Sequence, residues 1–267
     1  HLGQGELSAF IGERGIKMDT LIRTVNIPGL AQKQVEMLND EARDFYLSYI
    51  AGINAYIATQ KSEYPVSMQL LSHQPEPWTL HDIIAIQLFQ IWGTSANWKT
   101  ELLTQQVIDK LGAEKALEIA MITVNPDDNS IKIRELEPSS AQAVLEQAST
   151  GLQIEQAWLD TFPEATSAAS NAWATTKTKS ANGQAILVNS PHLDAKRTPG
   201  FWHPIGIFTP EFRAIGVAAP GTPGFGIART EDIAFGATNG YSDGVDLYIE
   251  QLDPANENHY LEGDESL

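Results

Sequence analysis

The chain has 267 residues, 42% hydrophobic and 19% charged, which is enough to bury a substantial core in one large or two ordinary domains. Its formal net charge of −17 argues against a nucleic-acid partner, because such a chain repels phosphate backbones. The absence of cysteine excludes disulfides, thiolate zinc sites and a cysteine nucleophile. No apolar run reaches about 18 residues, so a membrane-spanning helix is not expected.

Neither end of the sequence looks like the natural end of a chain. The start, HLGQGELSAF, has no basic region followed by an apolar core, so no signal peptide is expected. It lacks Met and opens inside a helix-like pattern, and the end, YLEGDESL, closes no obvious element. We therefore expect both ends to be cut from a longer protein.

The first half of the chain has the periodicity of helices. Short helices are expected over residues 5–12 and 15–25, and the strongest pattern covers residues 34–60, where apolar residues recur at spacings of three and four. After the break at PEPW, Thr79 and Asp82 form a predicted capping box for a helix over residues 80–92. Further helices are expected over residues 101–111, 114–122, 141–147 and 152–159.

After Ser170 the pattern changes to strands separated by Gly and Pro turns. Residues 171–178 and 184–189 are predicted to form a hairpin with its turn at residues 180–183, and a tight connection at residues 229–232 joins two later strands. The fold class expected is α+β. Its predicted parts are a mostly helical portion at 1–150, a linker at 151–169 and antiparallel strands over 170–267.

Common catalytic and metal motifs are absent or weak. The chain has no G-x-S-x-G, no H-E-x-x-H and no G-x-x-x-x-G-K. The glycine-rich PGTPGFG has a strand context, which favours tight turns over phosphate binding. PDDN lacks the remaining spacing of a calcium loop. Four histidines are interpreted as surface or packing residues: His73, His81, His203 and His259.

Ser170 stands between a small-residue run, Ser167–Ala169, and a predicted strand. If the bond before it is cut, Ser170 carries a hydroxyl and a free α-amine, whose reference pKa near 8 makes it a competent base around neutrality. Activation of a hydroxyl by the amine of an N-terminal residue is an established catalytic device. The same pattern alone also fits an ordinary linker serine.

The surrounding motifs make the interpretation specific. SNAWATTKTKSANGQAILVNSPHL resembles the start of the β chain in the penicillin acylase family of N-terminal-nucleophile hydrolases, with Ser-Asn-x-Trp, a glycine turn and Asn-x-Pro-His-Leu. PGTPGFGIARTEDIAFGATNGYSDGVDLYIEQLDP resembles the family's P-G-x-x-G-x-N-x-x-I-A-W-G-x-T-N segment and the acidic D-x-V-D that follows it. FYLSYIAGINAYI and LLSHQPEPWTLHDIIAIQ are similar to α-chain segments, so the resemblance covers nearly the whole chain.

The resemblance implies three catalytic positions. Ser170 matches the nucleophile, which would first attack the carbonyl of Ala169 in self-cleavage, where the family often has Gly. His192 stands where members carry Gln or His, and is expected to hold the α-amine or nearby backbone; a structural His is the alternative. Asn239 matches a backbone N–H donor of the oxyanion hole, or Thr238 does if the alignment slips by one. A second donor, an Asn further along the family's β chain, has no counterpart here.

The resemblance also implies a structural Ca²⁺ site, with no cofactor for the bond cleavage itself. Asp243, Val245 and Asp246 match the family's metal loop, and Glu101 matches the α-chain glutamate that completes it. Carboxylates with a backbone carbonyl are hard oxygen ligands that suit Ca²⁺. The alternative is that these are ordinary acids at the edge of a strand.

The function that follows from the resemblance is hydrolysis of the amide bond of small N-acyl substrates, penicillin side chains first. Self-cleavage at Ala169–Ser170 would make a heterodimer of α and β chains in an αββα sandwich, in the periplasm, with neither nucleic acid nor membrane as partner. Acyl-homoserine lactone cleavage is the alternative activity, and His192 resembles that branch and the cephalosporin acylases more than the penicillin G branch. A truncated fragment or proenzyme without activity is the remaining alternative.

Overall fold

The computed structural model describes residues 1–60, 64–71, 73–95, 98–112, 115–116, 169–193, 201–238, 240, 247–248, 250–263 and 265–267. The chain forms two compact units, His1–Thr94 with Ile154–Gly240 and Ser95–Gln153 with Tyr241–Leu267. Helices and antiparallel strands both occur, which confirms the α+β expectation, while the four-layer sandwich stays a prediction. Within the described ranges no helix combines the length and the apolarity needed to cross a bilayer.

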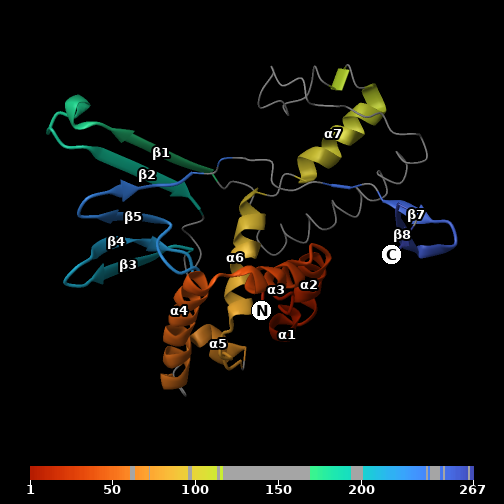
Figure 1. The fold of residues 1–267 in the computed structure, drawn as a ribbon, viewed down its shortest axis with the longest axis horizontal. Helices are drawn as coiled ribbons and strands as arrows, with labels where there is room; N and C mark the ends of the chain where they lie inside the picture. Colours follow the sequence, from red (N-terminus) through yellow and green to blue (C-terminus); the bar gives the residue numbers. More distant parts are fainter. Residues whose placement is uncertain are drawn as a thin grey trace. The chain divides into compact units, whose positions relative to one another are not determined.

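Helices make up the N-terminal part of the first unit, and Figure 1 shows them in red to yellow. Their bounds are α1 Ser8–Ile11, α2 Glu13–Thr24, α3 Ile27–Met37, α4 Asp40–Thr59, α5 Val66–Leu70 and α6 Leu80–Ser95. The helices predicted over residues 15–25 and 80–92 are confirmed by α2 and α6. Asp82 forms the predicted capping box, since its Oδ2 accepts from the Thr79 N–H at 2.8 Å and its own N–H donates to the Thr79 hydroxyl at 3.4 Å.

The single helix predicted over residues 34–60 is wrong, because two helices share this range. Leu38 is extended, with ψ 128°, and the Asn39 side chain accepts from the Ala42 N–H at 2.8 Å. Asn at an N-cap satisfies a donor that the first helical turn leaves free, so it starts a new helix. The apolar spacing continues across the break, so the periodicity of the sequence gives no sign of it.

The core of the first unit lies among α2, α3, α4 and α6. Its largest fully buried side chains, each less than 2% exposed, sit on three of these helices: Met18, Leu21, Ile22, Ile27 and Ile83. Burying one such side chain stabilises the fold by roughly 1.5–3 kcal/mol. Tyr49 packs at the edge of this cluster, and its partial burial raises the pKa of its phenol above the ordinary value.

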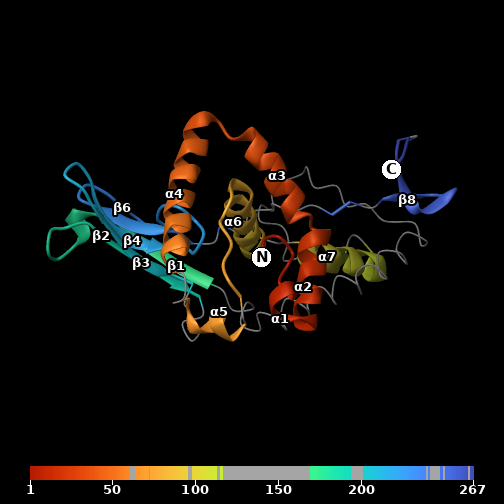
Figure 2. The ribbon, with the colours of Figure 1, turned by 90° about the horizontal axis from the view of Figure 1, so that it is seen from below.

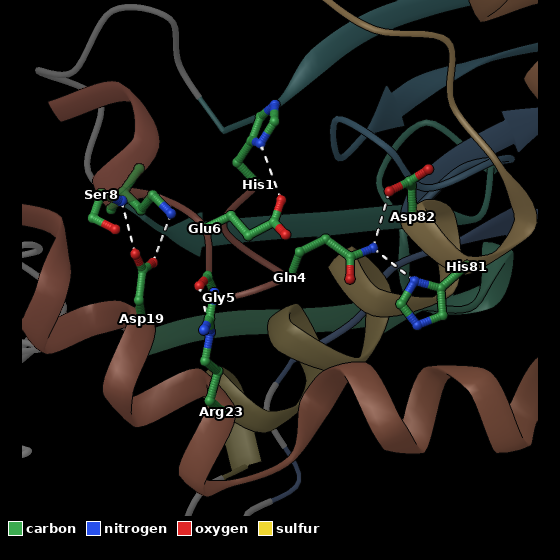
Figure 3. Close-up of polar contacts among 10 residues, drawn as sticks. His1, Gln4, Gly5, Glu6, Ser8, Asp19, Arg23, His81 and Asp82 are labelled. Atoms are coloured by element: carbon green, nitrogen blue, oxygen red, sulfur yellow. Dashed lines mark hydrogen bonds and ion pairs between the residues drawn. The ribbon is translucent and has the colours of Figure 1, made fainter. Parts of the chain in front are cut away.

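Polar contacts bind the N-terminal turn to the helices behind it. Asp19, only 6% exposed, accepts from the Leu7 N–H at 2.6 Å and the Ser8 N–H at 2.8 Å, so a buried carboxylate satisfies two backbone donors (Figure 3). The Gln4 amide donates to Asp82 at 2.9 Å and lies 2.8 Å from Nδ1 of His81. The other ring nitrogen of His81 lies 2.8 Å from a backbone carbonyl, that of Pro28.

Two antiparallel sheets follow the helices in the described part of the first unit. One is the hairpin of β1 (Ala169–Thr175) and β2 (Ile186–His192); the other has the order β3-β4-β5-β6. The bounds of the latter are β3 His203–Phe208, β4 Arg213–Ala218, β5 Ile227–Thr230 and β6 Ala234–Phe235. In both views the hairpin lies next to the four-stranded sheet (Figures 1 and 2). The predicted hairpin and the predicted tight connection at residues 229–232 are confirmed.

The loop between β4 and β5 contacts α6 and explains the glycine-rich PGTPGFG. The Gln90 amide donates to the Pro220 carbonyl at 3.1 Å and accepts from the Thr222 hydroxyl at 2.8 Å. Gly221, between them, has φ +76°, and a Cβ there would come within 2.9 Å of Ile86 and 3.1 Å of Trp78. The glycine is needed because the turn is left-handed and the helix is close.

The second unit contains α7 (Trp98–Leu111) and a sheet of β7 (Gln251–Asp253), β8 (Asn256–Glu262) and β9 (Glu265–Ser266). The predicted stop of α7 at Gly112 is confirmed, with φ +81°. A hydrogen bond from the Ser266 hydroxyl, with another from a backbone N–H, lowers the pKa of Asp253. The helices predicted over residues 141–147 and 152–159, most of that over 114–122, and the linker up to residue 168 lie outside the described residues.

Candidate active site

Ser170 lies at the open end of the β1–β2 hairpin. In the antiparallel register Ser170 is opposite Pro191 and Ala169 is opposite His192, so the two ends of the motif meet. The turn sets this register, because the Asn182 side chain accepts from the Gln184 N–H at 3.0 Å. Ser170 is half-buried and His192 is exposed.

Both strands extend further toward the site than the sequence indicated. The predicted strands were residues 171–178 and 184–189, whereas β1 begins at Ala169 and β2 continues to His192. Lys177–Lys179 form a short 3₁₀ turn rather than strand. The bond predicted to be cut, Ala169–Ser170, therefore lies within a paired strand.

A third segment, residues 236–238 directly after β6, meets the hairpin beside Ser170. The Thr238 hydroxyl donates to the Ser170 carbonyl at 3.0 Å. The Asn189 side chain, on β2, donates to the Ala237 carbonyl at 3.0 Å and accepts from the Ala237 N–H at 2.8 Å. Two of the three contacts are thus made by the Asn189 side chain, for which the sequence predicts no role.

The proposed oxyanion donor Asn239 lies outside the described residues, one position beyond Thr238. Thr238, its alternative, is described, and its hydroxyl contacts the carbonyl of the proposed nucleophile. Two signals could have pointed to this segment: Gly236 at the start of GATNG, and Asn189 of the Asn-x-Pro-His-Leu motif, which lies inside a strand, where Asn is disfavoured.

The predicted metal loop is described only at its border. Asp243, Val245 and Asp246 lie outside the described residues. Glu101, on α7, accepts from the Leu247 N–H at 2.9 Å, so its carboxylate lies against the residue that follows the loop. Among the residues that are described, no group of three His, Asp or Glu side chains could hold a metal ion.

An apolar groove indents the helical part of the first unit, apart from the hairpin. It is lined by α3, α4 and the start of α6, including Leu47, Ile50, Trp78 and Leu80. None of the residues lining it belongs to β1, β2 or the segment after β6. The groove therefore does not form part of the candidate site at Ser170.

Comparison with known proteins points to one family. The family model described as penicillin amidase matches residues 1–267. An acyl-homoserine lactone acylase, QuiP, from Pseudomonas aeruginosa is 27% identical over 94% of this chain, and a penicillin acylase 2 proenzyme from a Pseudomonas species is 27% identical over 93%. Penicillin G acylase from Escherichia coli is 20% identical over 97% of the chain. The chain spans 29%, 32% and 36% of the lengths of these relatives.

Proposed function

Because the chain belongs to the penicillin amidase family, we propose that the protein hydrolyses the amide bond of small N-acyl substrates, with Ser170 as its nucleophile. The register that brings Ser170 and His192 to the same end of one hairpin is the observation that supports this most directly. The chain covers about a third of its relatives, so the activity is proposed for the full-length protein.

Maturation is the first proposed step. The Ser170 Oγ attacks the carbonyl carbon of Ala169, an ester forms as the C–N bond breaks, and the hydroxyl proton passes to the departing nitrogen. Water then hydrolyses the ester, so Ala169 ends as a carboxylate and Ser170 keeps its hydroxyl and gains a free α-amine. The products are an α and a β chain that stay together as a heterodimer.

Substrate hydrolysis uses the same atoms. The α-amine of Ser170 takes the hydroxyl proton as Oγ attacks the amide carbonyl, and it returns the proton to the leaving amine when the tetrahedral intermediate collapses. Water hydrolyses the acyl-serine and releases a carboxylic acid. The backbone N–H of Asn239 is the proposed donor to the oxyanion, a contact of the kind worth about 3 kcal/mol.

The test is Ser170→Ala in the full-length protein, followed by mass spectrometry and amidase assays. We expect the variant to remain one chain and to lose turnover by at least about 10³-fold. Ser190→Ala is the matched control, since Ser190 is exposed on the same hairpin, opposite Asn171. A Ser170→Ala protein that is still cleaved and still hydrolyses amides would overturn the mechanism.

The acyl group of the substrate is the next question. Relatives at the same identity include an acyl-homoserine lactone acylase and a penicillin acylase, so two substrate classes are candidates. We propose penicillin-type amides as substrates, with acyl-homoserine lactones as the second candidate. In the same assays, phenylacetyl amides and acyl-homoserine lactones of short and long chain separate the two, because kcat/KM ranks them directly.

We also propose that Glu101 helps to hold a structural Ca²⁺ together with Asp243, Val245 and Asp246. The contact between the Glu101 carboxylate and the Leu247 N–H supports this, because it brings a hard oxygen ligand to the border of the acidic loop. We expect Glu101→Gln to weaken Ca²⁺ binding about tenfold or more in calorimetric titration of the full-length protein. Glu41→Gln, an exposed glutamate of α4, is the control. Equal affinity in the two variants would contradict the assignment.

A further inference from the structure

Asn189 joins three pieces of backbone at the end of the hairpin that carries Ser170. Its amide donates to the Asn171 carbonyl on β1 and to the Ala237 carbonyl, both at 3.0 Å. Its Oδ1 accepts from the Ala237 N–H at 2.8 Å. The side chain therefore pairs with both polar groups of Ala237, as a neighbouring strand would.

This pairing replaces a backbone ladder that is absent between the two sheets. β2 pairs only with β1, and β6 only with β5, among the described strands. A side-chain amide carries one donor group and one acceptor, the same set as a peptide unit, so it can extend a sheet by one rung. The segment 236–238 is thus attached to the hairpin through Asn189 and the Thr238 hydroxyl.

Gly236 leaves the space that this contact needs. A Cβ at Gly236 would come within 2.5 Å of Oδ1 of Asn189, closer than any side chain tolerates. At Gly240, four residues later, an added Cβ would meet no atom of the described residues within 4 Å. The two glycines of GATNG therefore differ, and the Asn189 contact requires a glycine at 236 but not at 240.

We propose that Asn189 is a positioning residue of the active site: its amide fixes the segment 236–238 against the strand of Ser170. The inference rests on the proposed function, in which the next residue in the chain supplies an oxyanion donor. A donor that must meet a developing charge has to be held in place before the reaction, since a misplacement of about 1 Å can cost about 10²-fold in rate.

Asn189→Asp in the full-length protein is the sharpest test. The change is isosteric, but it removes both donors and turns a carboxylate toward two carbonyl oxygens. We expect kcat to fall about 10²-fold while KM stays within about twofold, because the lost alignment matters mainly in the transition state. Asn182→Asp makes the same substitution in the turn of the hairpin, where the side chain has only local contacts, and should leave kcat within about twofold.

Gly236→Ala tests the same contact without changing Asn189. We expect about a tenfold loss of kcat as the new methyl group displaces the amide, and faster hydrogen exchange of the Ala237 N–H by mass spectrometry. Gly240→Ala is the control and should change neither quantity. If Asn189→Asp does not yield folded protein, Gly236→Ala and Gly240→Ala still test the positioning role of Asn189.

These experiments distinguish a failure of the positioning role of Asn189 from a failure of the function proposed for Ser170. Unchanged kcat in Asn189→Asp, or a rise of KM alone, overturns the positioning role even when Ser170→Ala is inactive. If the wild-type protein shows no Ser170-dependent turnover, the proposed function fails instead. Hydrogen exchange then still decides whether Asn189 holds the segment, because equal exchange in Gly236→Ala and Gly240→Ala would show that it does not.

Discussion

The helices and the sheets of the first unit are held together by different means. The helices bury large apolar side chains completely, with Met18, Ile22 and Ile83 at 0% exposure. On the strands the buried hydrophobic residues are alanines, while Trp173 is 54% and Ile215 is 52% exposed. The sheet region therefore depends on backbone ladders and on side-chain contacts such as those of Asn189. We therefore expect most of the free energy of folding of this unit to come from its helices, and the geometry of the candidate site to be set by a few polar groups in the sheets.

The largest expected effect on stability is therefore in the helices. Ile22→Ala should lower the free energy of unfolding by about 3 kcal/mol, from lost apolar burial and the cavity left behind. Ile215→Ala, the same substitution at a half-exposed position of β4, should lower it by less than about 1 kcal/mol. Urea denaturation of the full-length protein, followed through the transition in which the helices unfold, measures both.

Similar losses of unfolding free energy in the two isoleucine variants would contradict this difference between helices and sheets. Such a result would mean that the exposed face of β4 is covered in the full-length protein, so that both regions depend on apolar burial. A large loss of unfolding free energy in Ile22→Ala with a small loss in Ile215→Ala would support the difference, because it would assign the stability of this unit to its helices.

Local signals were enough to predict much of this fold. The capping box at Thr79 and Asp82 and the stop at Gly112 follow from contacts or dihedral preferences within a few residues. The meeting of Ser170 with the end of β2 is also a local matter, because a turn fixes an antiparallel register and the register then fixes which residues face one another.

Other features could not be predicted from local sequence, either because two local signals conflict or because the contacting residues are far apart in the chain. The break at Asn39 was hidden because the apolar spacing of α3 runs on into α4, and only the cap decides between one helix and two. The contact between Asn189 and Ala237 joins residues 48 positions apart, which no turn or period encodes. The role predicted for Ser170 depends on the motifs around it, since a lone serine in a small-residue run is common, and it stays a prediction.

The smaller expected effect on the free energy of unfolding comes from a buried polar contact in the helical region. Asp19→Asn keeps the shape of the side chain but points an amide donor at one of the two N–H groups that the carboxylate accepts, those of Leu7 and Ser8. Because the side chain is buried, we expect a loss of about 1–3 kcal/mol in the free energy of unfolding. Asp44→Asn, on the exposed face of α4, removes the same charge and should change it by less than about 0.5 kcal/mol.

The activity of the Asp19→Asn protein tests whether stability and site geometry are controlled by different regions. If the helices supply stability and the sheet contacts supply geometry, Asp19→Asn should lower the urea midpoint and leave kcat unchanged, whereas Asn189→Asp should lower kcat more than it lowers the midpoint. An Asp19→Asn variant with a wild-type midpoint and a reduced kcat would reverse the assignment. It would place geometric control of the site in the N-terminal turn, because Asp19 and Arg23 of α2 both bond to that turn.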